Sequence, residues 1–142
     1  MIGYRYNEKK KVVIAYFCND IHPNSMQGKD YWCDGISNSL WKVFSQEDLI
    51  CLRNWAFDDI VRRAVSSVKT VAVAKVTDDC DVELAKKIAK DRLNLKWARL
   101  EKRILGELIA EINSWMNVVN YRSSKKLEKC NLKIASLSNH KE

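Results

Sequence analysis

A helical pattern that continues over residues 82–119 is the feature that most constrains the fold of this chain. A straight helix of that length measures about 57 Å, whereas a compact domain of 142 residues is roughly 37 Å across. Either the helix ends near Gly106, or it projects from the domain and buries its apolar stripe against another subunit. We expect the second arrangement and therefore a homo-oligomer. The stripe comprises Trp97, Leu100, Ile104, Leu108, Ile112, Trp115 and Val119.

The N-terminal part of the sequence predicts a small sheet. Residues 2–6 and 11–18 are rich in β-branched and aromatic residues and are joined by the polar NEKK, a pattern typical of a β-hairpin. KTVAVAKV at 69–76 predicts a further strand suited to the middle of a sheet, and SLWKVFS at 39–45 predicts a short one. Residues 19–38 hold the only proline and two of the four glycines, and we interpret them as a long loop.

Helices complete the predicted fold. The first runs over 46–65 and begins at a capping-box-like pair, Ser45 and Asp48. The long helix over 82–119 follows the turn TDDCD, whose carboxylates can cap it, and a short helix is predicted over 124–136. The fold class is therefore α+β: a small, mostly antiparallel N-terminal sheet with one packed helix and a long C-terminal oligomerising helix.

Composition indicates one globular domain over residues 1–142, with a sheet-rich part at 1–76 and a helical part at 77–142. Apolar residues make up 46% of the chain and charged residues 30%, an apolar share too large for a disordered segment. The formal net charge of +7 either favours partners that carry phosphate or only keeps the protein soluble.

Cysteine usage and hydropathy favour a soluble cytoplasmic protein that has no contact with a membrane. The cysteines are odd in number and none forms a Cys-x-x-Cys pair, which argues against a disulfide framework or a zinc ribbon. The longest strongly apolar run, VVIAYFC at 12–18, is too short to span a bilayer. The five cysteines are Cys18, Cys33, Cys51, Cys80 and Cys130.

Positive charge is concentrated in RLNLKWARLEKR at 92–103. Arg92, Lys96, Arg99 and Arg103 follow one another at steps of four, three and four, which places them within about a 60° arc of a helix. We call these four residues the basic strip and expect it to lie opposite the apolar stripe. Small residues extend the same arc in both directions and would let a ligand approach closely: Ala85, Ala89, Gly106, Ala110 and Ser114.

The basic strip has two interpretations. Asp91, Glu101 and Glu107 are near enough for weak intrahelical ion pairs, which would make the strip an ordinary solvated face. Alternatively, its three guanidinium groups hold phosphate oxygens with the lysine assisting, while Asn94 or Trp97 lies beside a nucleobase. Trp97 also fits a place in the core or at an interface.

Other patterns argue against most kinds of chemistry. The acidic cluster at 78–83 lacks the ligand spacing of an EF-hand and is explained by helix capping. Cys18, His22 and Cys33, with Asp34 as a fourth ligand, match known zinc spacings poorly. The chain has two histidines and no glycine loop that would cradle phosphates. We therefore expect a protein that is not an enzyme, with no catalytic residue, no metal and no cofactor.

One segment carries a resemblance. VAVAKVTDDCDVELAKKIAKDR, residues 71–92, resembles a pattern of short phage and prophage proteins: a small-residue strand, an acidic turn, then a helix that opens with Ala-Lys-Lys-Ile-Ala. Cys80 stands where that pattern has an aromatic residue. In outline the chain is similar to the anti-Thoeris sponge family, small oligomers with an N-terminal sheet and long C-terminal helices. The resemblance implies binding, without cleavage, of a cyclic ADP-ribose isomer made by bacterial TIR immune proteins.

The expected function is that of a non-enzymatic phage protein in the host cytoplasm. It would sequester a cyclic nucleotide immune signal, either a cyclic ADP-ribose isomer or a cyclic oligonucleotide, and so inhibit anti-phage defence. Two alternatives stay open. The basic strip also fits a small basic nucleic-acid-binding protein, and exposed Trp32 and Trp41 would fit an inhibitor that docks directly onto a host protein.

Overall fold

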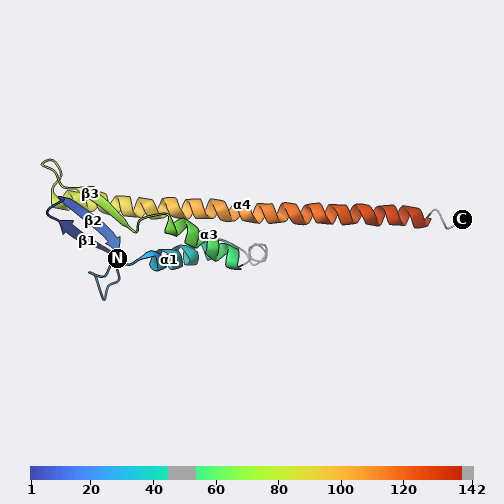
Figure 1. Ribbon diagram of the computed structural model, residues 1–142, viewed down its shortest axis with the longest axis horizontal. Helices are drawn as coiled ribbons and strands as arrows, with labels where there is room; N and C mark the ends of the chain where they lie inside the picture. Colours follow the sequence, from blue (N-terminus) through green and yellow to red (C-terminus); the bar gives the residue numbers. More distant parts are fainter. Residues whose placement is uncertain (45–53, 139–142) are drawn as a thin grey trace.

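A computed structural model describes residues 1–44 and 54–138 of the chain. Three strands and two short helices gather around the first half of one very long helix, whose second half extends away from them (Figure 1). This arrangement confirms the predicted α+β class. The elements are β1 (Ile2–Asn7), β2 (Val12–Phe17), α1 (Lys29–Trp41), α3 (Asn54–Ser66), β3 (Val71–Lys75) and α4 (Val82–Ser138).

The sheet is antiparallel, in the order β1-β2-β3. The predicted hairpin is confirmed, with Ile2 paired to Phe17 and Asn7 to Val12. Lys11, at the end of its turn, has a positive φ of 49°, and the Asn7 side chain accepts a hydrogen bond from the Lys10 amide at 3.1 Å. The strand predicted at 69–76 is present as β3, but it lies at an edge of this sheet and not in its middle.

Residues 29–41 form helix α1, so the predicted loop is wrong over its second half. The strand predicted at 39–45 is wrong over its described residues, since 39–41 are helical and 42–44 form a turn and a bend. The physical reason is visible in the burial pattern. Trp32, Ile36 and Leu40 recur at steps of four, and all three are buried on one face of the helix. Packing of this face outweighs the glycine, serine and asparagine residues that separate them.

Helix α3 confirms the predicted first helix over residues 54–65 and extends to Ser66. Its core face includes Phe57, Val61 and Ala64, which are almost completely buried. The predicted start of this helix, with its cap at Ser45 and Asp48, lies outside the described residues.

Helix α4 begins where the acidic turn predicts. The Asp81 carboxylate accepts a hydrogen bond from the Leu84 amide at 2.8 Å, which makes Asp81 the N-terminal cap. The helix continues through Gly106 and past residue 119, so the helix predicted over 124–136 is part of α4 and not a separate element. Its 57 residues correspond to a length of about 85 Å.

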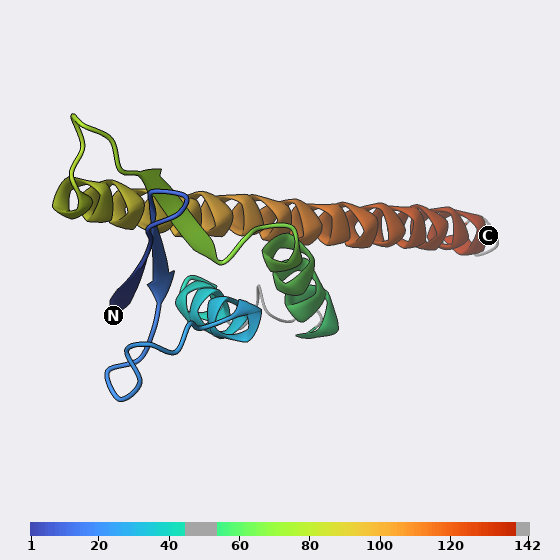
Figure 2. The same ribbon diagram turned by 60° about the vertical axis from the view of Figure 1, so that its left-hand side comes forward.

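One face of the sheet packs on the start of α4. Val13, Ala15, Ala72 and Ala74 are buried on this face, and small alanines on both surfaces let the helix approach the sheet closely. Farther along α4, helices α1 and α3 pack on the same side (Figure 2). The buried residues of α4 are Ala85, Ala89, Leu93, Leu100, Ile104 and Leu108.

This packing corrects the expected use of the apolar stripe. Leu100, Ile104 and Leu108 are buried against this chain's own core, so they are not available to another subunit. Ala85 and Ala89, expected to continue the basic strip, are buried with them.

Two further observations concern membrane-spanning helices and the state of the cysteines. Within residues 1–44 and 54–138, no helix has the length and apolar character needed to span a membrane. The four cysteines in these ranges, Cys18, Cys33, Cys80 and Cys130, are free thiols.

Candidate functional site

An open groove of about 430 Å³ runs along α4 beside the connection between α3 and β3. Its volume falls within the range of small-molecule sites. The structure brings all four residues of the basic strip together in its walls, with apolar side chains between them. We call it the basic groove; its lining residues are Val68, Arg92, Leu95, Lys96, Arg99, Leu100 and Arg103.

Two cations of the groove are anchored on the outer edge of β3. Arg92 donates from its guanidinium to the Val73 carbonyl oxygen at 2.8 Å. The Lys96 ammonium donates to the Val71 carbonyl oxygen and, at 3.1 Å, to that of Lys69. The Val71 and Val73 carbonyl groups lie on the edge of β3 that has no neighbouring strand among the described residues. Arg92 and Lys96 therefore cover a sheet edge as well as line the groove.

The other two cations of the groove, Arg99 and Arg103, make weaker contacts with the rest of the protein. Arg103 donates to the Ser67 hydroxyl oxygen at 3.2 Å and to the Glu107 carboxylate at 3.4 Å, both long contacts at an exposed position. Arg99 makes no hydrogen bond or ion pair with any residue that the structure describes. Its guanidinium retains five N–H donors for a ligand.

The electrostatics of the groove are unbalanced. No carboxylate is among the described residues that line it. Partial burial lowers the pKa of Lys96 below its ordinary value, and repulsion from Lys69 lowers it further. A bound anion would oppose both effects, because it stabilises the charged form of the lysine.

Two predicted site residues lie outside the groove. Trp97 faces the core, with its ring centroid 5.2 Å from that of Phe17 and 5.0 Å from that of Trp32. Its indole N–H donates to the Glu101 carboxylate at 3.1 Å. Asn94 is exposed and does not line the groove. Neither residue is placed to contact a nucleobase held beside the basic strip.

Sequence reasoning missed the apolar part of the groove. Leu95 and Leu100 flank the basic strip on α4, and Val68 faces them from the connection before β3. The spacing of Arg92, Leu95 and Arg99, at steps of three and four, contained a signal for Leu95. No local signal identifies Val68, because it joins the groove only through the tertiary fold.

The tryptophans proposed to dock on a host protein are not exposed. Trp32 is completely buried in α1, and its indole N–H has no hydrogen-bond partner among the described residues. Trp41 stacks on Phe57 with ring centroids 4.2 Å apart. The expectation was wrong because these residues belong to the core face of a helix and not to a loop.

The residues considered from sequence as metal ligands do not form a metal site in the described structure. Within the described ranges, no group of three or more His, Cys, Asp or Glu side chains is arranged to hold a metal ion. Cys18 is buried, and its thiol lies 3.8 Å from the Met1 carbonyl oxygen. In the acidic cluster at 78–83, Asp81 is the helix cap.

Comparison of the chain with protein-family models, with curated proteins and with solved structures finds no match.

Proposed function

We propose that this protein binds a small anionic nucleotide in the basic groove. The observation that carries the proposal is the lining itself: four of the described lining residues are cationic, the other three are apolar, and none is acidic. Arg99, with its unused donors, and Arg103, held only by long contacts, would bind phosphate oxygens bidentately. The apolar lining residues would take the base or sugar, the role first expected of Asn94 or Trp97.

The binding is proposed to be non-enzymatic. Lysine and arginine side chains hold charge in the groove, and its other lining residues are valine and leucine. The described lining residues include no Ser, Cys, His, Asp or Glu that could act as a nucleophile or pair with a general base. Such a groove suits capture of a ligand without its conversion. We therefore extend the proposal to a phage protein that sequesters a cyclic nucleotide immune signal in the host cytoplasm, with a cyclic ADP-ribose isomer as the first ligand to test.

Isothermal titration calorimetry with cyclic ADP-ribose isomers and with cyclic di- and trinucleotides tests the proposal. One of them should bind stoichiometrically, and mass spectrometry should recover it unchanged. Arg99→Ala should weaken binding roughly tenfold or more, because a charge-assisted contact is lost. Lys102→Ala is the matched control: it removes one exposed positive charge from the same helix without touching the groove lining. Absence of heat with every ligand, or equal losses in both variants, would contradict the proposal.

A specific observation also favours nucleic-acid binding as a second candidate. Positive charge continues along the distal part of α4, where Glu128 is the only acidic residue between 112 and 138. The basic residues there are Arg122, Lys125, Lys126, Lys129 and Lys133. Binding along a phosphate backbone would weaken steeply as salt increases and would need many nucleotides, whereas a small ligand in the groove would show a shallower dependence.

A further inference from the structure

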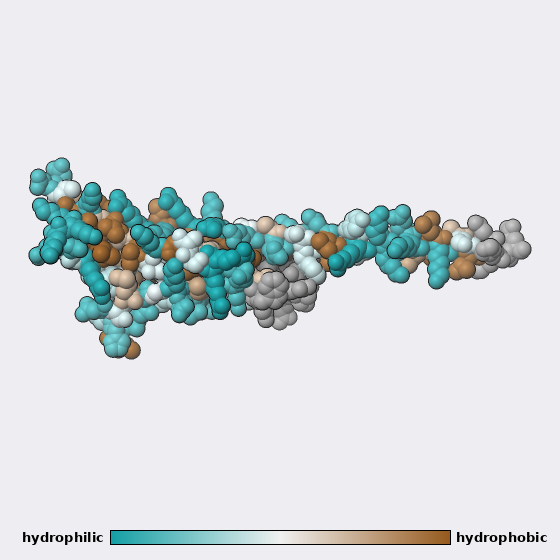
Figure 3. All heavy atoms as spheres, in the orientation of Figure 1, coloured by the Kyte–Doolittle hydropathy of each residue, from teal (hydrophilic) through white to brown (hydrophobic). Residues whose placement is uncertain are grey.

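The distal part of α4, residues 116–138, exposes a regular apolar row. It extends beyond the sheet, α1 and α3, and carries separate apolar patches on its surface (Figure 3). Leu127, Ile134 and Leu137 have relative exposures of 63%, 62% and 56%. At 100° per residue they fall on one face of the helix. We call this face the distal seam; its members are Met116, Val119, Ser123, Leu127, Cys130, Ile134 and Leu137.

The spacing of the distal seam is that of a coiled coil. Its residues follow one another at steps of three, four, four, three, four and three. Alternating steps of three and four define the heptad seam through which two helices pack. The two consecutive steps of four around Ser123 interrupt this alternation once. Such an interruption slightly unwinds the supercoil locally, and the two helices stay in contact.

Weak intrinsic helix propensity shows why this segment needs a partner. The run NVVNYRSS at 117–124 consists mainly of residues that favour helices poorly. The ion pair between Lys125 and Glu128 is exposed, with an N···O distance of 3.9 Å, and contributes little. Helices are stabilised mainly by packing of an apolar face, and beyond Met116 every described residue of α4 is exposed.

We propose that the distal seam pairs with the same seam of a second copy of this chain, in a parallel two-stranded coiled coil over Met116–Leu137. A second copy supplies a seam of identical spacing, so apolar residues meet apolar residues along its whole length. This surface shares only Val119 with the apolar stripe predicted from sequence, of which Leu100, Ile104 and Leu108 are buried within the chain. The proposal stands independently of any ligand in the basic groove.

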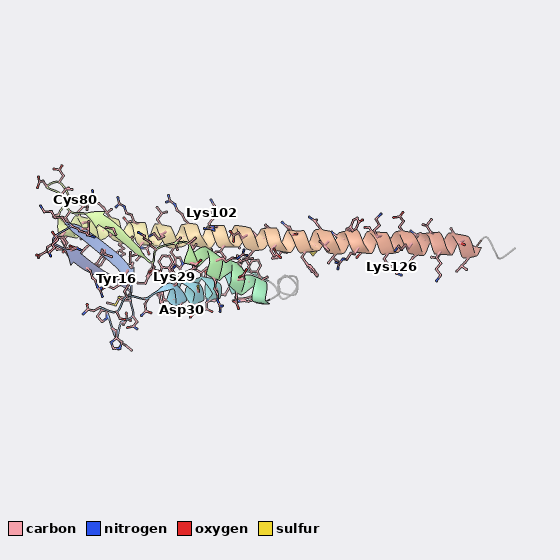
Figure 4. The ribbon with its side chains drawn as sticks, viewed as in Figure 1. Tyr16, Lys29, Asp30, Cys80, Lys102 and Lys126 are labelled. Carbon is pink, nitrogen blue, oxygen red and sulfur yellow. The ribbon has the colours of Figure 1, made fainter. Side chains whose placement is uncertain are left out.

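Charge on the flanks of the seam determines the orientation. Arg122, Lys126 and Lys133 lie along one flank, and neutral polar residues, among them Asn120 and Asn131, lie along the other. Figure 4 shows Lys126 on this distal part of α4. Parallel helices place each flank beside the opposite flank of the partner, so the basic side chains meet asparagine and serine. Antiparallel helices would place the two basic flanks against each other, which costs Coulomb energy.

Sedimentation equilibrium of the full chain, free of ligand, tests the pairing. We expect a mass twice the 16.5 kDa of the chain at micromolar concentration. Ile134→Glu, within the seam, should shift the protein to monomer. Leu132→Glu is the matched control, because Leu132 is 66% exposed but lies on the opposite face of the helix.

A monomeric parent protein, or a dimer that Leu132→Glu disrupts as strongly as Ile134→Glu, would overturn the proposal. Circular dichroism of each variant verifies that the globular part stays folded.

Cysteine cross-linking tests the orientation. In a parallel, in-register pair the two Cys130 side chains face each other, so the oxidant diamide should join two chains, and Cys130→Ser should prevent it. In the Cys130→Ser background, Leu137→Cys should restore the cross-link. Antiparallel pairing over the same seam would separate the two residues at 137 by about 30 Å. A dimer that forms no cross-link at either position would therefore refute the parallel arrangement.

Discussion

The ring of Trp97 on α4 occupies the space beside Gly35 on α1. A Cβ atom at residue 35 would lie 2.6 Å from the Cη2 atom of Trp97 and 3.0 Å from its Cζ2 atom. The ring is also in contact with Phe17 and Trp32, so it is held on several sides. Gly35 therefore allows α1, α4 and the end of β2 to meet around one indole.

Gly35→Ala is expected to destabilise the fold. The added methyl group would overlap an indole that already packs against Phe17 and Trp32, so the helices must separate slightly. Overpacking of this kind lowers the free energy of unfolding by about 1–3 kcal/mol. Chemical denaturation followed by tryptophan fluorescence measures the change.

Gly106→Ala supplies the matched control for that substitution. Gly106 also lies in a helix, but a Cβ atom there would have no neighbour within 4 Å among the residues that the structure describes. Alanine should raise the free energy of unfolding by about 0.5–1 kcal/mol, since glycine is the weaker helix former. Equal stability changes in the two variants would show that contact with Trp97 is not the reason why residue 35 must be glycine.

Asp81→Ala is expected to weaken the start of α4. The Asp81 carboxylate accepts the Leu84 amide, and loss of an N-terminal cap costs about 0.5–2 kcal/mol. Asp79→Ala removes the same charge from the turn without removing that hydrogen bond, so it should cost clearly less. Thermal unfolding of both variants decides between capping and simple charge at the helix terminus.

The sequence predicts best what depends on local pattern. Alternation of side chains placed the hairpin and β3, and the carboxylates of TDDCD placed the start of α4. The basic strip came together because Arg92 and Arg103 are related by helix geometry alone. In these cases the physical cause lies within a few residues of the feature it determines.

The parts that sequence reasoning missed depend on tertiary contacts. Helix α1 is stabilised by burial of Trp32, Ile36 and Leu40, although its polar and glycine residues are typical of loops. The buried face of α4 rotates gradually along the helix, from Ala85 to Leu108, because the sheet and then α1 and α3 pack on it in turn. For that reason the sequence pattern did not show that the stripe would be buried within the chain.

Trp41→Ala tests the corrected position of that residue. Because Trp41 is stacked on Phe57 and half-buried, its truncation should lower the free energy of unfolding by about 2–3 kcal/mol. Urea denaturation gives the value. A variant as stable as the parent would mean that Trp41 is exposed, as an inhibitory surface for a host protein would require.

The lowered pKa of Lys96 predicts how ligand affinity changes with pH. Burial and then Lys69 reduce the pKa below its ordinary value of 10.5, and an anion binds the charged lysine better than the neutral one. As pH rises through the lowered pKa, binding must therefore be accompanied by proton uptake, and the affinity falls by at most about tenfold per pH unit.

Calorimetry with a cyclic dinucleotide between pH 7 and pH 10 is suitable, since its phosphodiester charge is constant there. In Lys96→Arg the guanidinium stays charged, so the affinity should hardly change over this range. A decline of equal slope in both proteins would assign the pH dependence to a group other than Lys96.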